Sequence, residues 1–399
     1  MRAVPTPEFD LLLLCARMRI DDDHAQRISR LVRRSLDWNG LVLAARRHGL
    51  VPLLYRTLSG LDSNQVPSDI LERLHSIFEA FRFQNLVFLR ELLSAMQALE
   101  HAGVTAIPYK GPALADYLYQ DFALRHFVDL DLLVRPCDAV KARGVLQAHG
   151  FTPKRDIAEC ATVAWVKFHC EYSFNSPENQ ITLELNWRLA PRYWRLPEIP
   201  DAAWERLGRL SLAGVEVPWF APEDLLFVLC LHGCKHKWDT LKWLVDIAEL
   251  LRAHPGLDWR EITDLARRTG SERMLMIGLV LAHDLLNAPL PADVLEAARS
   301  KPLVSSLASE VCENLFATNI EPASTLTELA FLARAAERLD MKLCCQVLRP
   351  LYFLLHRVVR PGAGALQQVV RRPRAMVADR SKVAIENSPV PPPSSRRRI

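Results

Sequence analysis

Apolar residues recur at helical spacing in two long parts of the chain. From residue 8 to residue 100 Gly and Pro are rare, and the spacing predicts a helix, a Gly-containing turn and a second helix over 38–58, then a long helix over 77–103. The helical spacing returns at Pro222, where Pro stands at a first-turn position with acidic residues beside it. The pattern therefore predicts two helical regions separated by a different kind of structure.

Between these regions apolar and polar residues alternate in short runs bounded by turn residues, which is typical of β-strands. Strands are expected over 104–109, 128–134, 161–174, 181–187 and 212–220, and helices over 112–122 and 137–150. Helices interleaved with strands predict an α/β core. The expected fold class is α+β, with a mixed sheet flanked by N-terminal and C-terminal helical segments.

These changes of pattern divide the chain into four expected regions. They are an N-terminal helical region (1–102), a core (103–220), a C-terminal helical domain (221–360) and a tail (361–399). The tail is rich in Pro, Ser and Arg and is expected to be disordered, because it has too few apolar residues to pack. The apolar and basic run 348–361 is expected to be a last core helix rather than a membrane-surface helix.

Composition narrows the function classes. The 399 residues carry a net charge of +4, which does not favour a nucleic-acid-binding protein, although the basic tail leaves an RNA anchor as an alternative. Nine scattered cysteines without a signal peptide suggest reduced thiols and a cytoplasmic protein. No uncharged apolar stretch of about 18 residues occurs, so no membrane span is expected.

The run VDLDLLV carries two acids that can share one site. Side chains alternate along a strand, so Asp129 and Asp131 are expected on one face while their apolar neighbours pack on the other. Two carboxylates on one face repel unless a cation lies between them, and hard oxygen ligands suit Mg²⁺ or Mn²⁺. The alternative is a solvent-facing pair on an edge strand.

A third carboxylate has two candidates. In ITLELNW, Glu184 shares a polar face with Thr182 and Asn186. Glu171, in the run over 161–174, is its rival, and His169 beside it could serve as a base. Three carboxylates on adjacent strands can hold two metal ions for phosphoryl transfer. Glu184 is preferred because its face companions are small and neutral.

Lys110 and Gly111 lie between an expected strand and an expected helix. Gly permits close backbone approach, a helix N-terminus favours anions, and Lys adds positive charge, so the pair can receive a phosphate. A plain Gly turn with a solvated Lys is the alternative.

The segments YKGPALADYLY, LRHFVDLDLLV and LELNWRL, in this order, resemble an uncharacterised branch of the DNA polymerase beta-type nucleotidyltransferase superfamily. The similarity extends over roughly residues 38 to 250. It implies a metal held by Asp129 and Asp131, a third acid, and an NTP, ATP above all, whose triphosphate faces Lys110, Gly111 and Arg125. Relatives often have His at the position of Asn186, so the resemblance does not carry that residue's role over.

The segment CLHGCKH (230–236) suggests a zinc site, but four ligands from one helix cannot surround the ion. His232 and His236, with Lys235 nearby, are instead expected to face the nucleotide or the acceptor. Asp246 is an acid within an apolar helix, and a His or Lys of the preceding helix is its expected partner.

The sequence thus predicts a metal-dependent nucleotidyltransferase that moves a nucleoside monophosphate from an NTP to an unknown acceptor, a small molecule or a peptide or protein, and releases pyrophosphate. Asp129, Asp131 and Glu184 are the expected catalytic residues. The alternatives are a catalytically silent nucleotide-binding or partner-binding regulator and an RNA-modifying nucleotidyltransferase.

Overall fold

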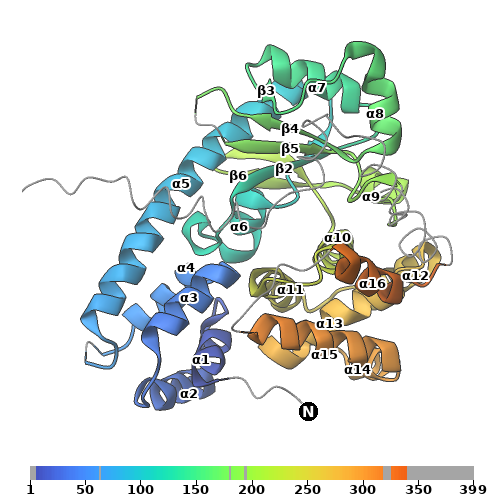
Figure 1. Ribbon diagram of the computed structural model, residues 1–399. Helices are drawn as coiled ribbons and strands as arrows, with labels where there is room; N and C mark the ends of the chain where they lie inside the picture. The colour runs from blue at the N-terminus through green and yellow to red at the C-terminus, as the bar shows by residue number, and fades with distance from the viewer. Residues whose placement is uncertain (1–5, 63, 179–180, 193–195, 318–324, 339–399) are drawn as a thin grey trace, which may run out of the picture.

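The computed structural model describes residues 6–338, apart from 63, 179–180, 193–195 and 318–324 (Figure 1). The expected helix over 348–361 and the expected disordered tail (361–399) lie outside the described residues.

The N-terminal region is helical, as its apolar spacing predicts. Its helices are α1 (Pro7–Cys15), α2 (Asp22–Val32), α3 (Trp38–His48), α4 (Val51–Ser59) and α5 (Ser68–His101). Side-chain oxygens of Thr6, Asp21 and Asp37 accept hydrogen bonds from the first-turn amides of α1, α2 and α3. Gly49 ends α3 with a φ of +69°, a conformation that glycine adopts without strain.

A mixed sheet of five strands forms the centre of the molecule. The strands are β1 (Ala106–Ile107), β2 (Asp129–Val134), β3 (Thr152–Pro153), β4 (Glu171–Asn175) and β5 (Thr182–Asn186). Their order is β1-β2-β5-β4-β3, and β2 and β5 are parallel while the other neighbours are antiparallel. The expected mixed sheet between helical segments is therefore confirmed.

The two faces of the sheet differ as alternation predicts. The leucines of β2 and β5 that point to one face (Leu130, Leu132, Leu183 and Leu185) are fully buried. Within the core the chain also forms α6 (Gly111–Tyr119), a 3-10 turn (Phe122–Leu124) and α7 (Ala139–Ala148). In Figure 1 the sheet lies between α7 and the C-terminal helices α10 (Pro222–Lys235) and α11 (Leu241–Ala253).

The expectation of one strand over 161–174 is wrong for its first half. A 3-10 turn (Glu159–Ala161) leads into helix α8 (Thr162–Phe168), which packs on α7, and only β4 is extended. β4 pairs residue for residue with β5, so the five residues of β5 set its length. The preceding residues have no strand edge to pair with and form a helix instead.

Two other expected strands are shorter than predicted. Only Ala106 and Ile107 of the run 104–109 pair in β1. The run 212–220 is a turn and one strand of a hairpin made of β6 (Gly208–Leu212) and β7 (Val215–Trp219). This hairpin is a second sheet of its own, and β7 contacts β1 of the main sheet. Ala213 and Gly214 both have positive φ, of +50° and +82°, as a tight hairpin turn requires. A short helix α9 (Asp201–Glu205) precedes this hairpin.

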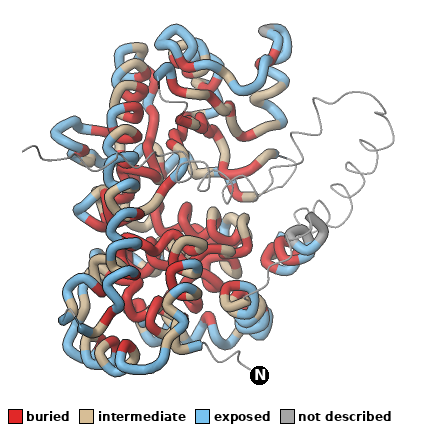
Figure 2. Tube along the Cα trace, turned by 60° about the vertical axis from the view of Figure 1, so that its left-hand side comes forward, coloured by how far each residue is buried: buried red, intermediate tan, exposed pale blue. Residues whose placement is uncertain are grey.

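Helices return after the hairpin. They are α10, α11, α12 (Trp259–Thr269), α13 (Glu272–Leu286), α14 (Ala292–Arg299), α15 (Pro302–Phe316) and α16 (Thr325–Ala335). Buried apolar residues run continuously from the N-terminal helices through the sheet to these helices (Figure 2). The division into separate domains stays a prediction.

Two further expectations concern cysteines and membranes. No disulfide joins any two of the described cysteines. No described helix is both long enough and apolar enough to cross a bilayer.

Helix α10 depends on a small residue at position 233. A Cβ added to Gly233 would overlap the ring of Trp238, which is fully buried. We expect Gly233→Ala to lower the free energy of unfolding by about 1–3 kcal/mol, the usual cost of overpacking, as measured by urea denaturation.

The matched control is Gly144→Ala in α7, where an added Cβ meets nothing within 4 Å. This change should be neutral or stabilise the protein by up to about 1 kcal/mol, since Ala favours helix. Equal effects of the two substitutions would show that the contact with Trp238 does not limit position 233.

Candidate active site

Acidic side chains gather on one face of the sheet because β2 and β5 are parallel and in register. Asp131 lies opposite Glu184, and Asp129 lies opposite Thr182. Asp131 and Glu184 are buried, whereas Asp129 is half-buried. Nδ2 of Asn186 donates to Oδ1 of Asp131 at 3.4 Å. Asn186 thus connects the two acidic strands at the position where the family resemblance left its role open.

Glu171 lies farther from the aspartates than Glu184 does. β4 adds to the outer side of β5 and pairs Ser173 with Glu184 and Glu171 with Asn186. Glu171 is therefore one strand beyond Glu184 and displaced along it. His169 ends α8 and stacks on the ring of Trp165, with 3.6 Å between ring centroids. Burial is the largest cause that lowers the pKa of His169.

Lys110 and Gly111 lie over the start of β2. Nζ of Lys110 is 2.9 Å from Oδ2 of Asp131, and both side chains are largely buried. Gly111 begins α6 with a φ of +61°, and a Cβ placed there would lie 3.7 Å from the carbonyl oxygen of Asp129. The N-terminus of α6 and the Lys110 ammonium thus stand directly beside the two aspartates.

Tyr109 belongs to the same group, and the sequence pattern did not single it out. It is buried, and Nζ of Lys110 lies 5.0 Å from its ring centroid. Burial, and then the charges of four carboxylates, raise the pKa of the Tyr109 phenol well above its ordinary value. These carboxylates are Asp131, Glu184, Glu171 and Asp129. The phenol therefore stays protonated and can donate a hydrogen bond toward the acidic face.

Arg125 has a different environment from the one expected. Its Nε and Nη2 donate to the two carboxylate oxygens of Asp246, each at 2.8 Å, and the hydroxyl of Tyr119 donates to Oδ1 at 2.8 Å. The side chains of Arg125 and Asp246 are only 4% and 1% exposed. Two of the three guanidinium nitrogens are thus occupied within the protein rather than directed to a triphosphate. Asp246 pairs with this arginine and not with a His or Lys of the preceding helix.

The amide of Asn85 holds the segment around Arg125. Nδ2 of Asn85, in α5, donates to the carbonyl oxygens of Phe122 and Arg125, at 2.5 and 3.1 Å. Asn85 is itself buried. Helices from both sides of the core, α5 and α11, therefore position the segment that enters β2.

The histidines of α10 lie near this group. His232 and His236 pack against Trp243, with centroid distances of 5.2 and 5.3 Å. Burial, followed by the charge of Lys110, lowers the pKa of His232 well below its ordinary value. His232 lies in the last turn of α10 and His236 caps the helix. That these two side chains face the nucleotide or the acceptor stays a prediction.

The other polar groups of α10 are used within the protein. Nζ of Lys235 donates to the carbonyl oxygen of Leu189 at 2.8 Å. Cys230 and Cys234 are fully buried in the core, and burial raises the pKa of both thiols. Within the described ranges of the chain, the ligand atoms of these two thiols and of the imidazoles of His232 and His236 do not come together within 4.8 Å of one another.

The donor set on the acidic face fits a hard divalent cation. The donors are carboxylate oxygens, which hard divalent cations prefer. In the structure the ammonium of Lys110 supplies the positive charge next to Asp131. In the part of the chain that the structure describes, one group of three ligand side chains, Asp21, Asp23 and His24, has its ligand atoms within 4.8 Å of one another. That group lies at the start of α2, where Asp21 caps the helix and contacts Nδ1 of His24.

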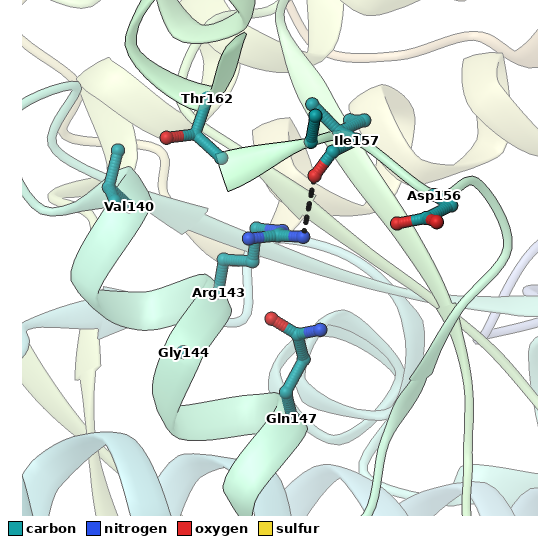
Figure 3. A pocket seen from close by; sticks show the side chains of 8 residues that line it. Val140, Arg143, Gly144, Gln147, Asp156, Ile157 and Thr162 are labelled. Carbon is teal, nitrogen blue, oxygen red and sulfur yellow. Dashed lines mark hydrogen bonds between the residues drawn. The ribbon is translucent and has the colours of Figure 1, made fainter. Parts of the chain in front are cut away.

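A surface hollow of about 450 Å³ lies elsewhere, between α7 and the segment before α8 (Figure 3). Arg143 crosses it and donates to the carbonyl oxygen of Ile157 at 3.2 Å. None of the acidic strand residues lines this hollow, so it is separate from the candidate active site.

A family model described as an uncharacterised nucleotidyltransferase matches residues 34–287, which is more than half of the chain. No curated protein matches the chain, and no solved structure matches it.

The buried pair between Arg125 and Asp246 yields a stability prediction. Asp246→Asn removes the negative charge and leaves the guanidinium of Arg125 buried without a carboxylate. We expect the free energy of unfolding, measured by urea denaturation, to fall by about 3–5 kcal/mol.

Asp284→Asn is the matched control, since Asp284 pairs with Arg299 at the surface, where the side chains are 32% and 49% exposed. That substitution should change stability little because water screens the pair. If the two substitutions cost the same, the buried pair is not the stronger constraint that its geometry indicates.

Proposed function

Because the chain belongs to the uncharacterised nucleotidyltransferase family, we propose that it transfers a nucleoside monophosphate from an NTP, specifically ATP, to an acceptor and releases pyrophosphate. Membership of the family makes the chain a transferase of phosphorus-containing groups, with an NTP as one substrate. The observation that carries the finer proposal is the register of β2 with β5, by which Glu184 lies beside Asp131 on the polar face.

In this proposal Asp129 and Asp131 hold Mg²⁺, which Mn²⁺ can replace. When bound, such an ion neutralises charge that develops on the attacking and leaving oxygens. The burial of the two aspartates supports their assignment as metal ligands, because Asp129 is half-buried and Asp131 is buried. The carboxylate of Asp131 is held by Nζ of Lys110 and Nδ2 of Asn186.

Lys110 and Gly111 receive the triphosphate. The amides at the start of α6 favour an anion, and the Lys110 ammonium, 2.9 Å from Asp131, would be within reach of a phosphate bound to a metal ion that this aspartate holds. Gly111 has no Cβ, so the phosphate can approach the backbone closely. Tyr109, kept protonated by its acidic surroundings, can donate to the same oxygens.

Glu184 orients the acceptor and takes up its proton. A buried carboxylate beside Asp131 can accept a hydrogen bond from an acceptor hydroxyl, which aligns the attacking oxygen. The acceptor is a small molecule or a peptide or protein. His232, in the last turn of α10, and His236, which caps that helix, are proposed to contact the acceptor. A cytoplasmic location is part of the proposal.

The first test replaces both aspartates. Asp129→Asn combined with Asp131→Asn should abolish Mg²⁺-dependent ATP binding and lower turnover by at least about 100-fold, because the amides cannot replace anionic ligands. Binding is measured by calorimetry with and without Mg²⁺, and turnover by pyrophosphate release with a panel of metabolite and peptide acceptors.

The exposed Asp156→Asn is the control and should behave as the wild-type protein does. Unchanged activity of the folded double variant would rule out metal binding by these aspartates. Metal-dependent ATP binding by the wild-type protein without turnover on any acceptor would instead favour a silent regulator.

The second test separates the two glutamates. Glu184→Gln should lower turnover by about 100-fold or more, the usual worth of a general base, with less than about threefold change in ATP affinity. Glu171→Gln should have a milder effect because Glu171 lies one strand farther from Asp131. If Glu171→Gln has the larger effect on turnover, the third acid is on β4 and not on β5.

A further inference from the structure

Lys242 brings a positive charge from the C-terminal helices to the candidate active site. It lies on α11 four residues before Asp246, so the two side chains share one face of the helix. Helix α11 packs against α6, the helix that begins at Gly111 (Figure 1). The charges close enough to Lys242 to affect its pKa are those of Arg125, Asp129, Asp246 and Lys110.

Lys242 is costly to hold in this position. Burial is the largest cause that lowers the pKa of its ammonium; the charges of Arg125 and Lys110 also lower this pKa, whereas those of Asp129 and Asp246 raise it. Among the described residues Lys242 forms no salt bridge, since Asp246 is paired with Arg125 and Asp131 with Lys110. The charges around this half-buried ammonium are thus two cations and two carboxylates, one of which, Asp246, is already bound by Arg125, so an added anion would be stabilised here.

The backbone makes room for this lysine. Gly49, between α3 and α4, packs on its aliphatic stem, and a Cβ at that position would lie 2.9 Å from Cδ of Lys242. The positive φ of Gly49 requires glycine there as well. The N-terminal helices therefore hold the stem of Lys242, and its ammonium is left to interact within the site.

We propose that Lys242 is a phosphate-binding residue, which contacts the non-transferred phosphates of the nucleotide and the pyrophosphate that leaves. Lys242 would make the triphosphate contact that the family resemblance implies for Arg125, while Arg125 and Asp246 position the helix that carries Lys242. The identification of the anion as a nucleotide rests on the proposed function. Phosphate binding by Lys242 can be tested with any polyphosphate, whether or not it carries a nucleoside.

The test measures binding of inorganic tripolyphosphate, ATP and adenosine to the full chain by calorimetry in the presence of Mg²⁺. Lys242→Met and Lys242→Gln should each weaken tripolyphosphate and ATP by about 10- to 100-fold, as expected for loss of a charged hydrogen bond. Adenosine carries no phosphate, so its affinity should be unchanged. Thermal unfolding of each variant verifies that the fold is intact.

The control is Lys141→Met, which removes an exposed lysine of α7 and should leave all three affinities as in the wild type. Affinities for tripolyphosphate within twofold of wild type in both folded Lys242 variants would overturn the proposal, as would a wild-type protein that binds no tripolyphosphate. A site that binds tripolyphosphate through Lys242, in a protein that forms no transfer product from any NTP, would keep this inference and refute nucleotidyl transfer.

Discussion

The buried ion pair between Arg125 and Asp246 determines how the candidate active site is assembled. Removing both charges from water costs several kcal/mol per ion, and the cost is offset only by excellent geometry and further hydrogen bonds. The pair has both, since the contact is bidentate and the hydroxyl of Tyr119 adds a third donor. Arg125 lies four residues before Asp129, and Asp246 lies four residues after Lys242. One interaction therefore sets the distance between the acidic strand and the helix that faces it.

The acidic face illustrates what can be predicted from sequence. Alternation is a local property, so the shared face of Asp129 and Asp131 and the polar face of the Glu184 strand could be inferred without knowledge of the fold. The preference for Glu184 over Glu171 could be argued from the short strand ITLELNW, its match to the family pattern and the small neutral neighbours of Glu184, but not from register, which depends on distant segments. The pairing of β2 with β5 shows that Glu184 lies opposite Asp131, whereas Glu171 lies on the next strand, opposite Asn186.

Other features could not be predicted because they depend on partners far along the chain. Residues 162–168 have the apolar content of a strand, but no free edge is beside them, and they form α8. An acid within an apolar helix predicts that a cation partner exists and does not say which one. The nearby lysines and histidines of α10 were the natural choice for Asp246, whereas the actual partner is 121 residues away.

The choice of arginine at one position and lysine at two others follows from the same physics. The planar guanidinium of Arg125 stays charged at any pH and fits both oxygens of a carboxylate, which suits a contact that never changes. The ammonium groups of Lys110 and Lys242 are compact charges on flexible stems, and they can exchange one oxygen partner for another. Lys110 now neutralises Asp131, which otherwise would be buried among like charges. A cation that occupies the aspartates would release this ammonium to a phosphate a short distance away. Under the proposed function, a fixed arginine and two lysines that can change partners would let the same face of the sheet be stable before substrate binds and complementary to a polyphosphate afterwards.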